Sequence, residues 1–64
     1  MPRTTFPLPV GSALRWAAKQ AMYLRDEGYG DAVLDAVQPL FARYAHTGDA
    51  SHLQLAHRLL EGER

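Results

Sequence analysis

The chain has 64 residues, of which 47% are hydrophobic and 22% are charged, proportions typical of a globular domain. It contains no cysteine, which excludes a disulfide framework and thiolate metal sites. The formal net charge is zero, which argues against general nucleic-acid binding. A domain this short buries only about 60% of its unfolded surface, so we expect dense helix packing or oligomerisation to stabilise it.

The sequence predicts neither a membrane span nor a secretory signal. No apolar run approaches the roughly 20 residues of a span. Residues 1–9 are interrupted by prolines and polar residues, whereas a signal needs a continuous apolar stretch. We therefore expect one soluble domain in the cytoplasm.

The formal charges are unevenly distributed along the chain. Residues 1–25 contain four basic residues and no acidic residue, and residues 26–64 contain three basic and seven acidic residues. The two parts therefore carry charges of +4 and −4. Two interpretations follow: the first helix is electrostatically complementary to its neighbours within the chain, or it presents a basic surface to an acidic partner.

The first eleven residues are expected to form an extended arm. Three prolines fix φ there and bias the preceding residues toward extended conformations. Alternate apolar side chains would point to one side of the arm: Phe6, Leu8 and Val10. The arm either packs these side chains over the helices or docks, like a peptide, on another subunit or protein.

A first helix is predicted over residues 12–27. Ser12 is a suitable N-cap, and Gly28 suits the left-handed position that follows a helix, with Tyr29 supplying the apolar contact of such a cap. This helix has two apolar faces. One face is rich in small residues: Leu14, Ala17, Ala18, Ala21 and Leu24. The other, nearly opposite, consists of Trp16, Gln20 and Tyr23.

A second helix is predicted over residues 31–47, with Asp31 as its N-cap. Apolar residues recur at helical spacing throughout this segment: Val33, Leu34, Val37, Leu40, Phe41, Tyr44 and Ala45. Pro39 removes one backbone donor in the middle, yet the apolar spacing continues through it unshifted. The pattern therefore predicts one kinked helix rather than two helices.

A third helix is predicted over residues 50–61, followed by a tail at 62–64. Ser51 and Gln54 match a capping box, and Asp49 is the rival N-cap. Short loops favour antiparallel neighbours. The expected fold is an all-α three-helix domain, a helical hairpin plus a shorter third helix, with the extended Pro-rich N-terminal arm.

Little in the sequence indicates a reaction. His46, Asp49 and His52 lie close enough to gather a metal ion, but a position near a helix end explains His46 and a cap explains Asp49. His57 and Glu61 are spaced for an exposed ion pair. Both serines of the chain are explained as helix caps. We therefore expect no enzyme activity, cofactor or metal.

Two functions remain open. Arg15, Trp16, Lys19 and Tyr23 combine positive charge with aromatic faces, as in proteins that bind nucleic acids, and this is the alternative hypothesis. The favoured hypothesis is a non-enzymatic protein–protein interaction module: a small adaptor, regulator or inhibitor of a larger protein, acting as a homodimer. The predicted interface consists of Trp16, Lys19, Gln20, Tyr23, Phe6 and Leu8, because large aromatic residues are enriched at interface hot spots.

The opposite assignment of the two faces is also open. The aromatic residues would then fill the core, and the alanine-rich face would form a close seam between two copies of the chain.

Overall fold

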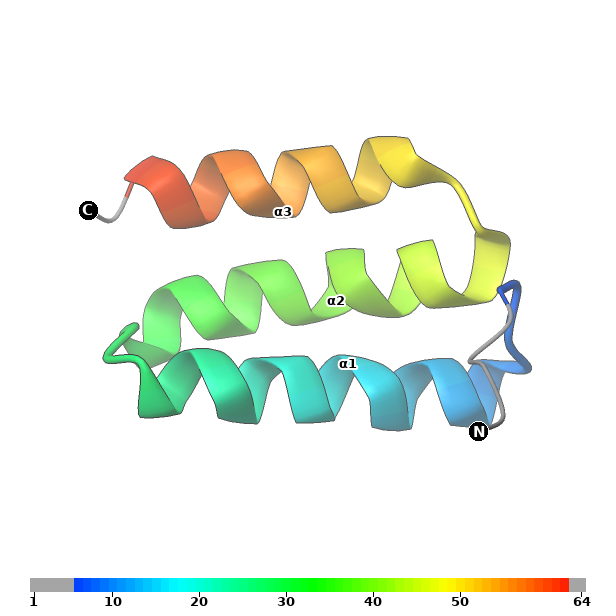
Figure 1. The fold of residues 1–64 in the computed structure, drawn as a ribbon, viewed down its shortest axis with the longest axis horizontal. Helices are drawn as coiled ribbons and strands as arrows, with labels where there is room; N and C mark the ends of the chain where they lie inside the picture. The colour runs from blue at the N-terminus through cyan, green and yellow to red at the C-terminus, as the bar shows by residue number, and fades with distance from the viewer. Residues whose placement is uncertain (1–5, 63–64) are drawn as a thin grey trace.

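A computed structural model describes residues 6–62. It contains α1 (Val10–Asp26), α2 (Asp31–Thr47) and α3 (Ala50–Gly62), with no strand in the described part of the chain. Consecutive helices are antiparallel, and α2 lies between α1 and α3, packing against both (Figure 1). The expected all-α three-helix fold is confirmed. No helix in the described range is long and apolar enough to cross a membrane.

The start of α1 differs from the prediction. The helix begins at Val10, two residues before Ser12, and Pro9 is its N-cap residue, with a ψ of 153°. The Pro9 carbonyl accepts the first helical hydrogen bond, from the amide of Ala13 at 2.8 Å. Ser12 lies inside the helix and is exposed, so the prediction of Ser12 as the N-cap was wrong.

The predicted arm is correspondingly shorter. Val10 and Gly11 are helical rather than extended, and residues 1–5 lie outside the described residues. Leu8 is attached to the end of α2 by its backbone. Its amide donates to the Ala45 carbonyl at 2.7 Å, and Nδ1 of His46 donates to the Leu8 carbonyl at 2.8 Å.

α1 ends in the left-handed cap that the sequence predicts. Gly28 has a φ of +105°, and its amide donates to the Arg25 carbonyl at 3.0 Å. The amide of Tyr29 donates to the Leu24 carbonyl at 3.2 Å. These two bonds form a Schellman motif, and both Leu24 and Tyr29 pack against the edge of the core.

The second helix covers the range expected from the sequence and runs without interruption through Pro39. The proline is exposed, on the side of α2 away from the core. The prediction of Asp31 as the N-cap was wrong, because Gly30 occupies that position and Asp31 is the first helical residue. Asp31 instead pairs with Arg25 at 3.1 Å. Both side chains are exposed, so this ion pair contributes little stability.

Asp49, rather than Ser51, caps the start of α3, whose first helical residue is Ala50. Oδ1 of Asp49 accepts a hydrogen bond from the Ser51 amide at 3.0 Å, as an N-cap side chain does. Hydrogen bonds from the backbone and the side chain of Ser51 lower the pKa of Asp49 below its ordinary value of 3.8. The capping box predicted at Ser51 was therefore wrong. The side chain of Asp49, two positions earlier, accepts the hydrogen bond of the Ser51 amide, which has no partner within the helix.

The core lies where α2 meets the other two helices, and small residues let the backbones approach closely there. Val37 is the largest side chain that is fully buried. The buried core residues, none of them polar within the described range, are Ala13, Ala17, Val33, Leu34, Val37, Phe41, Ala45, Ala56 and Leu60.

Candidate functional site

The candidate site is a groove between α1 and α3. Each of these helices packs against α2, and they make no close backbone contact with one another. The space left between them, above α2, has a volume of about 410 Å³. Its lining is mainly aromatic and aliphatic: Phe6, Trp16, Gln20, Tyr23, Leu24, Glu27, Phe41, Tyr44, Leu53, His57 and Leu60.

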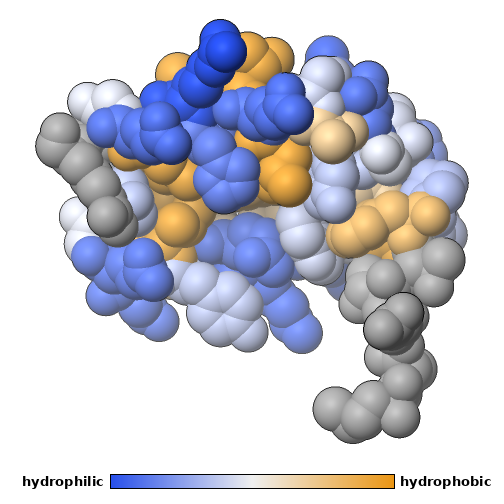
Figure 2. All heavy atoms as spheres, turned by 45° about the horizontal axis from the view of Figure 1, so that its top comes forward, coloured by the Kyte–Doolittle hydropathy of each residue, from blue (hydrophilic) through white to orange (hydrophobic). Residues whose placement is uncertain are grey.

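Figure 2, which views the molecule from the α3 side, shows apolar side chains reaching the surface between polar ones. Burial of these apolar side chains by a partner is favourable at roughly 25 cal/mol per Å². An apolar groove with few polar groups on its walls is the kind of surface that recognises apolar side chains.

An aromatic cluster forms one wall of the groove. Trp16 is half-buried and stands nearly edge-on to Phe41, with ring centroids 6.0 Å apart and an interplanar angle of 83°. It is also edge-on to Phe6, at 5.3 Å and 82°, and tilted against Tyr44 at 5.8 Å. Such edge-to-face arrangements are favourable for aromatic pairs. The indole is therefore held in place by the chain's own rings.

The sequence-predicted interface residues lie in two adjoining hollows. Phe6, Trp16, Gln20 and Tyr23 line the groove. A second hollow, of about 250 Å³, is lined by Trp16 together with Leu8, Ser12, Arg15 and Lys19. Trp16 thus separates the two hollows. Tyr23 is the most exposed of the aromatic side chains, at 61%, and stands at the rim of the groove.

The two apolar faces of α1 share the core between them. Ala17 is fully buried, and the adjacent Trp16 is half-buried against the same cluster. Both residues contact the core because α2 packs on α1 between its two apolar faces. The outer edges of both faces are exposed, with Leu14 at 56% on one side and Tyr23 on the other. Neither face as a whole is the core face.

The groove residues that the sequence did not predict for the interface come from all three helices: Leu24 and Glu27 of α1, Phe41 and Tyr44 of α2, and Leu53, His57 and Leu60 of α3. Leu53, His57 and Leu60 form the wall opposite Trp16, and Glu27 closes one end. The apolar pattern of α3 could identify Leu53 and Leu60 as facing inward. It could not show that they face α1 across an open space.

The polar groups near the groove are few. The ion pair expected between His57 and Glu61 is not formed in the part of the chain that the structure describes, where Arg25 pairs with Asp31. Within residues 6–62 no three metal-ligating side chains come together. His46 is engaged with the Leu8 carbonyl instead. The walls therefore offer shape and apolar contact, with Gln20, Glu27, His57 and the hydroxyls of Tyr23 and Tyr44 as the polar groups.

Comparison of the chain with protein-family models, with curated proteins and with solved structures finds no match. The assignment of a function therefore depends on the geometry of the site.

Proposed function

We propose that this protein is a non-enzymatic protein–protein interaction module, a small adaptor, regulator or inhibitor that acts on a larger protein. The observation that carries the proposal is the groove between α1 and α3, with its aromatic wall and aliphatic opposite wall. Aromatic side chains in well-packed pockets are typical of the energetic centres of protein interfaces.

The dimensions of the groove favour an amphipathic helix as its occupant. On α1 the lining runs from Trp16 to Glu27, about 16 Å at 1.5 Å per residue. This length matches about three helical turns, enough for apolar anchors at positions i, i+4 and i+7 of a partner helix. Tyr23 at the rim would cover the entering side chains and offer its hydroxyl to a polar group of the partner.

Nucleic-acid binding is the less supported alternative. Arg15, Trp16 and Lys19 do line one hollow, but the Trp16 ring is engaged by Phe6, Phe41 and Tyr44. Stacking of a base needs a free aromatic face. The neutral net charge of the chain gives no general attraction to phosphates.

We also propose that the module acts as a homodimer. A domain of this size gains a substantial part of its stability from any apolar surface that a second copy covers. The groove then remains available to the larger partner only if the two copies meet elsewhere.

A display library of amphipathic helical peptides tests the proposed function with the full chain as bait. We expect the selected peptides to share large apolar residues at i, i+4 and i+7. Tyr23→Asp should weaken their binding at least about tenfold, since it places a charge at the apolar rim. The control is Leu55→Asp on α3, because Leu55 is 49% exposed and does not line the groove.

Two results would contradict the proposal. One is a library that yields no peptide above a scrambled background. The other is a set of peptides that bind wild type and Tyr23→Asp equally well. Selective retention of single-stranded nucleic acid, with an affinity that falls steeply with salt, would favour the alternative function instead.

A further inference from the structure

The space between α1 and α3 has the form of the missing fourth position of a helical bundle. In a four-helix bundle each helix packs against two neighbours and faces the remaining helix across the core. Here α2 has two neighbours, whereas α1 and α3 each pack against α2 alone within the described residues. Phe41 and Tyr44 of α2 line the groove between them. A helix placed in the groove would therefore contact both α1 and α3.

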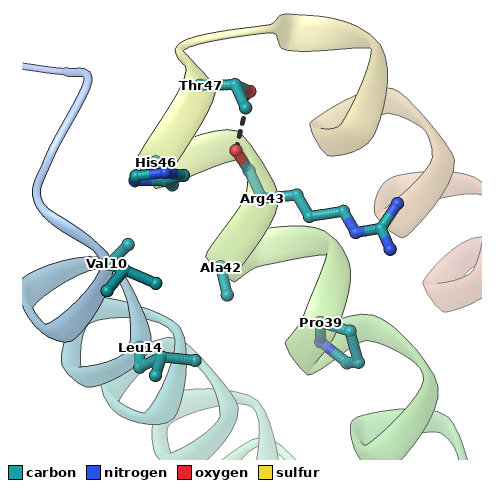
Figure 3. A pocket seen from close by; sticks show the side chains of 8 residues that line it. Val10, Leu14, Pro39, Ala42, Arg43, His46 and Thr47 are labelled. Atoms are coloured by element: carbon teal, nitrogen blue, oxygen red, sulfur yellow. Dashed lines mark hydrogen bonds between the residues drawn. The ribbon is translucent and has the colours of Figure 1, made fainter.

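A hollow on the other side of α1 lacks charges that select a partner. It lies between Val10 and Leu14 of α1 and Pro39 of α2, with a volume of about 280 Å³. Arg43 also lines this hollow, but Figure 3 shows its guanidinium projecting away from Val10 and Leu14. The groove between α1 and α3 differs, because charged groups lie at its ends.

Two glutamates flank the groove at the end of the molecule where α1 and α3 both finish (Figure 1). Glu27 lines the groove at the end of α1. Glu61 follows the groove residue His57 by four positions, and residues at this spacing lie on the same side of a helix. Glu61 therefore extends the α3 wall by one turn, opposite the wall that contains Glu27.

Neither glutamate has a cationic partner within residues 6–62. The ion pair found there joins Arg25 to Asp31, so Arg25 does not neutralise the end of the groove. Arg58 of α3 projects about 100° around the helix from His57, away from the groove. Both glutamates are exposed, so their charges are available to a partner.

The other end of the groove is close to positive charges. Trp16 lines the groove there and also the adjoining hollow, whose walls include Arg15 and Lys19. Neither of these two basic residues forms an ion pair within the described part of the chain. A helix in the groove would therefore meet acidic groups at one end and basic groups near the other, and only one charge pattern complements both ends.

We infer that the groove binds an amphipathic helix with a particular charge pattern. Lys or Arg follows its apolar stripe at the end that lies between Glu27 and Glu61, and Asp or Glu lies at the end near Lys19. The inference rests on the proposed function and adds the chemistry of the partner's two ends. The apolar anchors supply most of the affinity, because exposed ion pairs contribute mainly to selectivity and to the association rate.

The peptide library of the proposed function tests this inference when the positions flanking the apolar stripe are randomised. With the wild-type chain as bait, we expect Lys or Arg to be enriched at one end of the stripe and Asp or Glu at the other. Replacement of the basic end of the best peptide by glutamine should weaken its binding about fivefold. This loss should shrink as salt is added.

Two double variants with the same change of formal charge provide the decisive comparison. Glu27→Gln with Glu61→Gln removes both groove carboxylates and should bind the selected peptide and its glutamine version with equal affinity. The matched control is Asp26→Asn with Asp35→Asn, because neither of these aspartates lines the groove. It should retain the fivefold difference. Fluorescence anisotropy of the labelled peptides measures the affinities, and circular dichroism shows whether each variant keeps its helices.

The outcomes separate this inference from the proposed function. A library that yields no peptide would contradict both. Selected peptides without a charge preference, or a preference that persists in the Glu27→Gln, Glu61→Gln variant, would overturn the inference and leave the helix-binding groove in place. A preference lost equally in the control variant would also overturn it, because the attraction would then depend on overall charge rather than on these two glutamates.

Discussion

Trp16 of α1 and Phe41 of α2 meet edge to face, with their ring centroids 6.0 Å apart at 83°. This contact joins the core to the groove, because Phe41 is buried and Trp16 is half-buried at the surface of the same cluster. The indole contributes to the fold through its contacts with Phe6, Phe41 and Tyr44, and it also lines the groove. Stability and binding should therefore be coupled at Trp16 and separable at Tyr23, which is mostly exposed.

Replacement of Trp16, in the wall of the groove, should lower the free energy of unfolding, whereas replacement of Tyr23, at its rim, should leave it almost unchanged. Trp16→Ala removes the contacts with Phe6, Phe41 and Tyr44 and should lower the free energy of unfolding by about 2 kcal/mol, less than for a fully buried tryptophan. Tyr23→Ala should change it by less than about 0.5 kcal/mol, because that side chain is mostly exposed. Urea unfolding followed by circular dichroism measures both, and equal effects of the two variants would contradict this division of roles.

The same substitution should have opposite effects at Gly11, inside α1, and at Gly28, just after its end. Gly11 lies within the first turn, where nothing surrounds an added methyl group within 4 Å, so Gly11→Ala should raise the free energy of unfolding by about 0.5 kcal/mol. Gly28 has a φ of +105°, which is strained for alanine, so Gly28→Ala should lower it by about 1 kcal/mol. Thermal or urea unfolding measures whether each substitution raises or lowers the free energy of unfolding. A shift in the same direction for both would mean that backbone conformation does not decide the outcome.

The cap at Asp49 should be visible in the stability of α3. Asp49→Ala removes the acceptor of the Ser51 amide and should lower Tm by roughly 5 °C at neutral pH. Asp49→Asn keeps a capping oxygen and should lower it less.

The cap also predicts a pH dependence. Because the pKa of Asp49 is lowered in the folded chain, its charge stabilises the fold above the ordinary value of 3.8. This contribution is lost as the pH falls through the lower folded pKa. The difference in Tm between wild type and Asp49→Asn should therefore stay constant from neutral pH to about pH 5 and shrink below about pH 4. A difference that is the same at pH 3 and pH 7 would contradict the role of the charge.

The segment before α1 should be ordered at Leu8. Its amide donates to Ala45 and its carbonyl accepts from His46, so the Leu8 amide should exchange with solvent more slowly than in an unstructured peptide. His46→Ala removes one of the two bonds and should speed this exchange about fivefold, whereas His57→Ala, remote from Leu8 in sequence and on α3, should not. Hydrogen exchange measured by NMR decides between these results, and a Leu8 amide that already exchanges at the peptide rate in the wild type would show that the attachment does not persist.

The sequence by itself determined most of the helical fold. The apolar spacing from Val33 to Ala45 fixed α2, because a helical stripe that passes through Pro39 without a shift leaves no room for a break. Gly28 marked the end of α1, since a left-handed cap needs a residue without a Cβ. The N-caps were less well determined, because Ser12, Asp31 and Ser51 all have suitable side chains and lie within three residues of the groups that begin the helices, Pro9, Gly30 and Asp49.

Only the tertiary structure decided how the two apolar faces of α1 are used. Helical periodicity shows that Trp16 and Leu14 lie on different sides, but not where α2 approaches. It approaches between them, so that Ala17 is buried, Trp16 lines a groove and Leu14 remains exposed. The groove itself depends on α1 and α3 both packing on α2 and not on each other. That arrangement is set by the side-chain volumes at the two contacts with α2, which the pattern of one helix does not contain.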